Sequence, residues 1–167
     1  MTLGRALLLT SAFLLSAALP VFTAAAPVPA HPVVKLQLTG DLLALADGKI
    51  VATPVDKAVL KRGDLVRYTI VASNAGGKPA VALSTVGPVP ARMEYVAGSA
   101  SHAPAASVEF SLDGKSFSAQ PMVTVNTSRG PVQKPADPEQ YVAVRWVNAR
   151  PLAPKQRVRY TYEVRVK

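Results

Sequence analysis

Few side chains in this chain are arranged for catalysis or for metal binding. The 167 residues include no cysteine and only two histidines, His31 and His102. These histidines stand far apart, one among prolines and one among small residues, and do not have the close spacing of metal ligands. Ser99 and Ser101 lack the Gly-x-Ser-x-Gly pattern of an activated serine, and no histidine is placed to activate them. We therefore expect no metal, no cofactor and no nucleophilic catalysis.

The ten acidic residues are dispersed along the chain. Asp47-Gly48 and Asp113-Gly114 resemble fragments of calcium loops, but they lack the alternating oxygen donors of such loops and are typical of turns. Carboxylates distant in sequence could still converge in space as an acid and base pair, so a hydrolase stays the last alternative. The sequence predicts a protein that is not an enzyme. The carboxylates that could converge are Glu94, Glu109, Glu139 and Glu163.

Basic residues outnumber acidic ones, 19 against 10, which gives a formal net charge of +9. Such a charge attracts nucleic acids, acidic polysaccharides and anionic lipid surfaces without specifying a fold. The basic residues are mostly single, with only Lys61 and Arg62 adjacent, so the chain has no polybasic tail. Aromatic residues do not alternate with outward arginines as in single-strand nucleic-acid platforms. We expect the partner to be a protein or an anionic polymer of the cell envelope, with no specific nucleic-acid binding.

Residues 1–26 have the pattern of a cleavable signal peptide. Arg5 precedes an apolar stretch over residues 6–19, which is followed by Pro20 and a run of small residues. The apolar stretch is shorter than the roughly 20 residues that span a bilayer. The pattern predicts cleavage within residues 23–27, export to the periplasm or the cell exterior, and no transmembrane anchor after processing. Residues 27–32 then form a stiff proline-rich tail.

The remaining residues, 33–167, are predicted to form one all-β domain. Apolar and polar residues alternate with period two, which places one set of side chains inward and the other outward. The clearest strands are residues 157–167, 65–74 and 141–147. Many short strands separated by turns are typical of a sandwich or a barrel. The expected aromatic core consists of Tyr68, Trp146, Tyr160 and Tyr162.

Shorter elements are predicted from residues that favour turns and helix ends. Asp113-Gly114 predicts a two-residue hairpin turn, because Asp-Gly supplies the positive φ angles of such turns. Residues 42–46 could form one helical turn, capped by Asp41 and ended by Gly48. Residues 126–140 contain three prolines and are expected to form a surface loop. Weaker strands are expected over residues 33–38, 49–53, 80–86, 93–96, 108–112, 115–119 and 122–125.

Two segments carry a resemblance to a known family. Residues 60–76, with Gly63-Asp64 entering a strand, and residues 87–100, with Pro-Val-Pro before Tyr-Val-Ala-Gly-Ser, resemble the conserved repeat domain called domain of unknown function number eleven. Arg145-Trp146 and residues 151–166 are similar to the closing strand pair of that family. The resemblance implies an immunoglobulin-like antiparallel β-sandwich in a bacterial cell-envelope or extracellular setting, with no known catalytic residues.

One constellation of arginines predicts a binding site. If residues 141–147 and 156–166 pair antiparallel, their buried faces must coincide, and Arg145 then lies beside Arg157 or Arg159. Like charges opposed across strands cost up to about 1 kcal/mol unless water or an anion separates them. Arg67 joins them if its strand lies in the same sheet. We predict an anion-binding patch of Arg67, Arg145, Arg157 and Arg159, with a solvated polar face as the alternative.

Three non-enzymatic functions stay open. The first is an exported module that contacts proteins or envelope polymers. The second is a binder of an anionic glycan or lipid headgroup through the arginine face. The third is the addition of a partner peptide as a strand to an exposed sheet edge, as chaperone-like sandwiches do.

Overall fold

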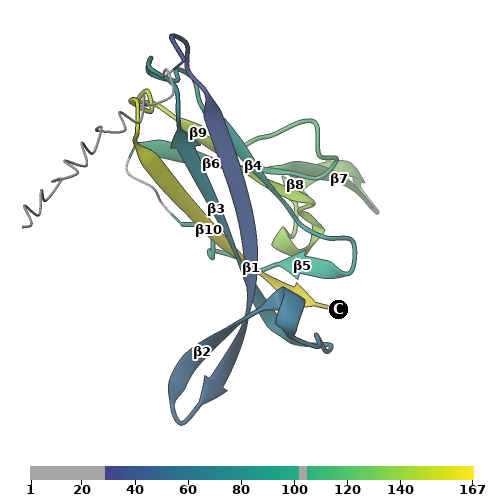
Figure 1. Ribbon diagram of the computed structural model, residues 1–167. Coiled ribbons are helices and arrows are strands. Elements are labelled where there is room, and N and C mark those ends of the chain that lie inside the picture. Colours follow the sequence, from purple (N-terminus) through teal and green to yellow (C-terminus); the bar gives the residue numbers. More distant parts are fainter. Residues whose placement is uncertain (1–28, 102–104) are drawn as a thin grey trace, which may run out of the picture.

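The computed structural model describes residues 29–101 and 105–167 (Figure 1). The predicted signal peptide and His102 lie outside the described residues. Within them, the regular structure consists of antiparallel strands and two short 3-10 turns, so the all-β prediction is confirmed. The elements are β1 (Val34–Ala46), β2 (Lys49–Pro54), η1 (Val55–Lys57), β3 (Leu65–Asn74), β4 (Ser84–Pro88), β5 (Met93–Tyr95), β6 (Ala106–Ser111), β7 (Met122–Thr127), β8 (Gly130–Pro135), η2 (Pro138–Gln140), β9 (Ala143–Asn148) and β10 (Arg157–Val166).

The described strands form a wide sheet, a narrow sheet and a separate hairpin. The wide sheet has five strands in the order β2-β1-β3-β10-β5, and the narrow sheet has three in the order β4-β9-β6. The hairpin of β7 and β8 projects from one side of the body, and the end of β1 with β2 projects from another (Figure 1). Two sheets of such different width cannot cover each other completely.

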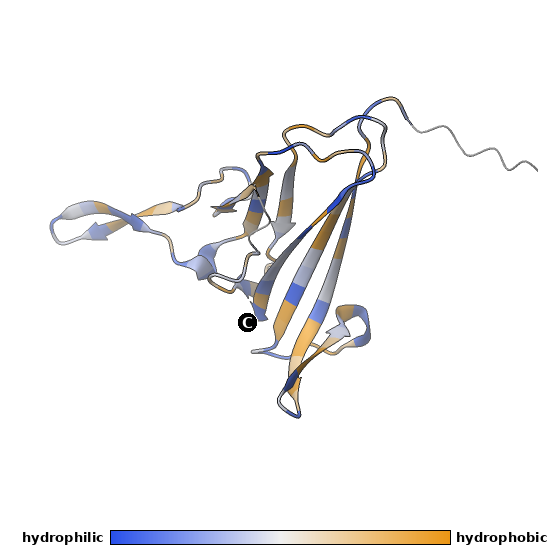
Figure 2. Cartoon of the chain, turned by 90° about the vertical axis from the view of Figure 1, so that its left-hand side faces the viewer, coloured by the Kyte–Doolittle hydropathy of each residue, from blue (hydrophilic) through white to orange (hydrophobic). Residues whose placement is uncertain are grey.

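The core lies between the wide and the narrow sheet. Apolar and polar residues alternate along the long strands (Figure 2), and the inward side chains of β10, Tyr160 and Tyr162, are completely buried. Trp146 of β9 is also completely buried, and its ring centroid lies 5.1 Å from that of Tyr160 and 5.9 Å from that of Tyr162. Since β9 and β10 belong to different sheets, these aromatic contacts hold the sheets together in a sandwich-like arrangement.

Tyr162 fixes the spacing between β10 and the narrow sheet. Its hydroxyl donates a hydrogen bond to the carbonyl of Pro88 over 2.6 Å, and burial raises the pKa of that hydroxyl. The Tyr162 ring also stacks on the half-buried Tyr68, at a centroid distance of 5.4 Å. Gly87 of β4 faces the Tyr162 ring, and a Cβ atom at that position would lie 2.5 Å from Tyr162 Cε1. The absence of a side chain at Gly87 therefore lets the two sheets approach.

Asn74, at the end of β3, is a buried polar centre that joins four segments. Its side-chain nitrogen donates to the carbonyls of Lys78 at 2.7 Å and Leu152 at 3.0 Å. Its side-chain oxygen accepts from the backbone N–H groups of Val33 at 3.2 Å and Gly76 at 3.0 Å. A buried amide with all these partners is satisfied and rigid. Asn74 thus fixes the start of β1, the chain after β3 and the connection before β10 relative to one another.

The antiparallel pairing of residues 141–147 with residues 156–166, on which the predicted arginine patch depends, does not occur. β9 pairs with β4 and β6, whereas β10 pairs with β3 and β5. The connection between them crosses from one sheet to the other, where Ala80 and Leu152 exchange two backbone hydrogen bonds of 2.9 Å. Alternation in two strands is compatible with pairing in one sheet and equally with packing across a core, and here the second arrangement holds.

The predicted helical turn at residues 42–46 is also wrong, because these residues belong to β1 and pair with β2. Asp47 and Gly48 form the two-residue turn between them, with φ angles of 49° and 71°. Both positive angles match the turn type whose twist suits a hairpin. The expected loop over residues 126–140 likewise contains β8 and η2.

The predicted hairpin at Asp113-Gly114 is replaced by a wider loop. Only Gly114 has a positive φ angle, of 75°, and the chain returns to pair at a single bridge between Phe110 and Ser118. The Asp113 carboxylate accepts the backbone N–H groups of Lys115 and Ser116, which holds the pKa of Asp113 below its usual range. These bonds stabilise a turn in which the side chain replaces a backbone partner, so the predicted strand over residues 115–119 is reduced to that bridge.

Two other strands begin later than expected. Most of the predicted strand over residues 80–86 precedes β4, which covers Ser84–Pro88. Val142 precedes β9 and is 41% exposed, although the sequence pattern groups it with the buried Val144 and Trp146.

Substitution of Gly87 by alanine tests the close approach of the sheets. We expect Gly87→Ala to lower the free energy of unfolding by about 1–3 kcal/mol, because the new methyl group overlaps the Tyr162 ring. Urea unfolding measures this change. Ser84→Ala, at an exposed position of the same strand, is the control and should change stability by less than about 0.5 kcal/mol. Equal free energies of unfolding for the two variants would show that the close approach of Gly87 to the Tyr162 ring does not contribute to stability.

Candidate functional site

The outer face of the wide sheet carries a group of basic side chains at one end. In the strand register, Lys35 of β1 and Arg157 of β10 both lie opposite Ser73 of β3. One row further along the strands, Arg159 lies opposite Val71. Residues directly paired across antiparallel strands project from the same face. Lys35, Arg157 and Arg159 therefore share this face around the neutral Ser73.

A fourth basic residue, Lys155, lies at the turn that enters β10. Its backbone has a φ angle of 64°, and its N–H group donates to the carbonyl of Asn74 over 2.8 Å. Two shallow surface depressions share Lys35, Ser73 and Arg157, and one of them also includes Lys155. We call Lys35, Lys155, Arg157 and Arg159 the basic cluster; all four are exposed.

The basic cluster has cationic groups that are available to a ligand. Among residues 29–101 and 105–167, the ion pairs are Arg67 with Glu163 and Arg145 with Glu109, and neither includes a member of the cluster. Arginine offers planar paired donors for carboxylate or phosphate groups, and lysine offers a mobile point charge. The arrangement is therefore chemically suited to anionic groups that approach the face of the sheet.

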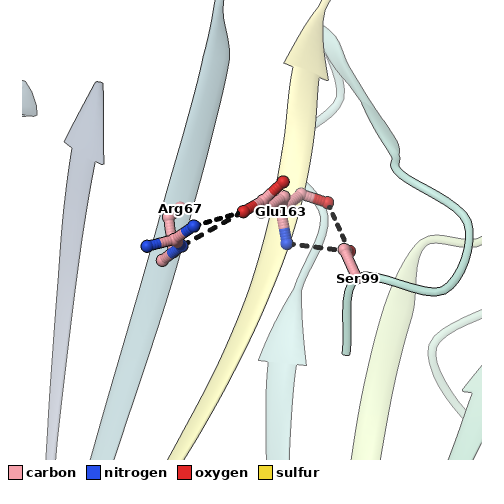
Figure 3. Close-up of polar contacts among 3 residues, drawn as sticks. All are labelled: Arg67, Ser99 and Glu163. Atoms are coloured by element: carbon pink, nitrogen blue, oxygen red, sulfur yellow. Dashed lines mark hydrogen bonds and ion pairs between the residues drawn. The ribbon is translucent and has the colours of Figure 1, made fainter. Parts of the chain in front are cut away.

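Arg67 belongs to a different row of the same face, where its charge is compensated. Its guanidinium donates to the Glu163 carboxylate at 2.8 and 3.1 Å, across the β3–β10 pair (Figure 3). The side chains are 41% and 23% exposed. An exposed pair of this kind adds little stability, but it occupies the donors of Arg67.

Arg145 lies on the other sheet, away from the basic cluster. It projects from β9 toward β6, donates to the Glu109 carboxylate, and places its guanidinium carbon 4.2 Å from the centre of the Phe117 ring. The structure thus brings together Arg157 and Arg159 of the predicted patch, whereas Arg67 and Arg145 have acidic partners. Lys35 and Lys155 were not predicted. The alternation of Val34-Lys35-Leu36 indicates a polar face at Lys35, but the sequence does not show that β1 neighbours β3.

Ser99 and Ser101 have a structural role at the edge of the wide sheet. The Ser99 hydroxyl accepts the N–H group of Glu163 at 2.9 Å and donates to the carbonyl of Glu163 at 3.3 Å (Figure 3). The Ser101 hydroxyl accepts the N–H group of Thr161 at 2.9 Å. These hydroxyls replace a neighbouring strand where β5 ends, so that this stretch of β10 keeps its hydrogen bonds.

The carboxylates considered for acid and base chemistry lie in different places. Glu109 and Glu163 are in the two ion pairs, whereas Glu94 and Glu139 line one shallow depression together with Arg165. In the described part of the chain, no group of three or more His, Cys, Asp or Glu residues could hold a metal ion. No helix there is long and apolar enough to cross a membrane.

In comparisons with known proteins, the chain matches no family model, no curated protein and no solved structure. The class that the structure itself defines is an all-β protein of antiparallel sheets with a sandwich-like core.

A double-mutant cycle measures whether Arg67 and Glu163 are coupled. We expect Arg67→Gln, Glu163→Gln and the double variant to give a coupling energy of about 0.2–1 kcal/mol in urea unfolding, because the pair is partly exposed. The coupling should decrease as salt is added. A coupling energy of zero at low salt would mean that Arg67 is free to bind another anion.

Proposed function

We propose that this protein is an exported, non-enzymatic module with an immunoglobulin-like β-sandwich, which binds an anionic polymer of the cell envelope through the basic cluster. Three observations support the proposal. The first 26 residues have the pattern of a signal peptide, residues 60–166 resemble an envelope-associated domain family, and the exposed cations of the cluster lack acidic partners in the described part of the chain.

The spacing of the cations favours a polymer over a single small anion. Lys35 and Arg157 are two strands apart, which corresponds to about 10 Å, and Arg159 follows Arg157 by about 7 Å along β10. A chain with repeated carboxylate or phosphate groups can contact several of these cations at once. Multivalent contact of this kind gives useful affinity from individually weak ion pairs. The net charge of +9 adds long-range attraction for such a polymer.

Contact with the face requires little movement of the protein. Arg157 and Arg159 project from β10, which is paired with β3, and Asn74 fixes the ends of the strands and the turn of Lys155. The cations thus project from backbone that is fixed by hydrogen bonds. The single observation that carries the proposal is this concentration of exposed cations which, among the residues that the structure describes, have no acidic partner.

Export is tested by the N-terminus of the protein recovered from its producing cells. We expect N-terminal sequencing to show a first residue within positions 23–27, because the apolar stretch is followed there by small residues suited to cleavage. Leu8→Arg, which interrupts the apolar stretch, should leave the leader attached and the protein inside the cell. Recovery of exported protein that still begins at Met1 would contradict the cleavage.

Binding is tested with alginate as a polycarboxylate and polyphosphate as a phosphate polymer. We expect titration calorimetry of the purified protein to detect binding that weakens with salt, and Arg157→Gln/Arg159→Gln to reduce affinity about five- to tenfold. The two polymers separate carboxylate from phosphate recognition.

The control for net charge is Lys115→Gln/Arg129→Gln, which removes two exposed cations that lie outside the outer face. This variant should retain most of the affinity for each polymer. Arg67→Gln, as a separate single variant, should do so too, because Arg67 is already paired with Glu163. Equal losses in the control and in the Arg157→Gln/Arg159→Gln variant would show attraction by total charge and would reject the cluster as a site.

A further inference from the structure

One end of the body carries basic residues and no acidic ones. This end comprises the start of β1, the chain between β3 and β4, and the connection between β9 and β10 (Figure 1). Residues 29–36, 73–84 and 148–158 contain no aspartate or glutamate. Their lysines and arginines, all of them exposed, are Lys35, Lys78, Arg150, Lys155 and Arg157. We call these residues the cationic end.

Asn74 holds the segments of the cationic end together. The carbonyl of Lys78 accepts a hydrogen bond from the Asn74 side chain, and the N–H group of Lys155 donates to the Asn74 carbonyl. The other cations lie one or two residues from a hydrogen-bond partner of Asn74: Lys35 follows Val33, Arg150 precedes Leu152, and Arg157 follows Gln156. One buried amide therefore fixes the backbone from which the whole cationic end projects.

Two loops of the cationic end lie side by side. Ala80 and Leu152 exchange two backbone hydrogen bonds of 2.9 Å, and the N–H group of Asn148 donates to the carbonyl of Leu83 over 3.0 Å. Val81, which follows Ala80, is 71% exposed. An exposed apolar side chain is thus held on the same pair of loops as Lys78 and Arg150.

The charges of the cationic end are not compensated within the described part of the chain, where neither ion pair includes one of its members. Along the wide sheet, the first carboxylates are Asp41 of β1 and Glu163 of β10. They lie six residues from Lys35 and Arg157, which corresponds to about 20 Å. The screening length in physiological salt is about 8 Å. The cations therefore act together on an anionic surface without interference from these carboxylates.

The chain enters the fold at the same end. The carbonyl of Pro29 accepts the N–H group of Gly77 over 2.7 Å, and the carbonyl of Val33 accepts that of Ala75 over 2.8 Å. The export proposed above, on which this point rests, brings the apolar stretch over residues 6–19 into a bilayer. The chain from position 19 to Pro29 is at most about 35 Å long. The cationic end is then the part of the body that is tethered closest to the membrane.

We propose that the cationic end docks on a bilayer surface that contains anionic lipids. Lysine and arginine side chains near such a surface are attracted by its negative potential, and their contributions add. Val81 inserts at the boundary between headgroups and acyl chains, where apolar side chains are stabilised. The strands of the wide sheet then stand on the bilayer, and their outer face remains accessible to a polymer.

Two observations favour a lipid surface over a polymer at this end. A polymer with repeated anionic groups requires cations only, whereas an exposed valine beside cations is suited to a lipid surface. The cations also come from three separate segments of the chain, so they are spread over the end of the body and do not follow one strand. Lys78 and Arg150 belong to the cationic end and not to the basic cluster, which allows the two sites to be tested separately.

Co-sedimentation with phosphatidylcholine vesicles that contain or lack phosphatidylglycerol tests the docking. We expect stronger binding to the anionic vesicles, which weakens as salt is added. Lys78→Gln/Arg150→Gln should reduce the affinity about tenfold, because each cation near an anionic surface contributes up to a factor of about five. The control Lys115→Gln/Arg129→Gln removes the same charge elsewhere and should reduce it less than about threefold. All variants share one N-terminus, so any contribution from the leader cancels in the comparison.

A fluorescent label tests the orientation, since the chain has no cysteine of its own. We expect an environment-sensitive dye on Val81→Cys to shift to shorter wavelength with the anionic vesicles, because this side chain inserts. The same dye on Val51→Cys should not respond, because this exposed residue of β2 lies at the opposite end of the body (Figure 1). Circular dichroism confirms that every variant is folded.

Three results would overturn the proposal. One is an equal loss of vesicle affinity in Lys78→Gln/Arg150→Gln and in its control, which would show attraction by total charge. Another is a dye on Val81→Cys that does not respond to the anionic vesicles. The third is loss of alginate or polyphosphate binding in Lys78→Gln/Arg150→Gln with unchanged vesicle binding, which would assign this end to the polymer. The vesicle measurements contain no polymer, so failure of the polymer site leaves their outcome unaffected.

Discussion

The contact of Trp146 with Tyr160 and Tyr162 is the interaction on which the rest of the structure depends. It places the narrow sheet over the middle of the wide one, with β9 above β10, and Gly87 permits the close approach. Because three strands cannot cover five, this placement also decides what stays uncovered. The inner face of β1 is left outside the core, and its exposed leucines are a direct consequence of where the aromatic side chains pack.

Asn74 connects this core to the surface that we propose as a binding site. Its amide fixes the start of β1, and its carbonyl accepts the N–H group of Lys155 at the turn into β10. The cations at this end of the sheet therefore lie on a framework that is rigid at its backbone. Further along the same face, Glu163 binds Arg67, so that available and compensated arginines occupy separate rows. The outer face of the wide sheet thus carries the basic cluster at one end, and in its middle the charge of Arg67 is compensated by Glu163.

The alternation of apolar and polar residues predicted well which segments are strands, but predicted poorly which strands pair with each other. The alternation around Tyr160 and Tyr162 identified a strand with one buried face, and both tyrosines are indeed buried. The two Asp-Gly pairs show the limit of local reasoning. Asp47-Gly48 forms the two-residue turn, whereas Asp113 uses its carboxylate to bind nearby backbone groups and opens the loop. The same dipeptide allows both outcomes, so it does not by itself fix the type of turn.

The sequence by itself determined the all-β class, the burial of Trp146, Tyr160 and Tyr162, and the exposure of Arg157 and Arg159, because each of these follows from the alternation of side chains along one strand. Only the tertiary structure decided that Arg145 lies on another sheet, that Lys35 joins Arg157 across Ser73, and that the first half of β1 pairs on one side only within the described residues. These properties depend on which strands are neighbours. Strand order is set by packing between residues distant in the chain, and no local pattern encodes it.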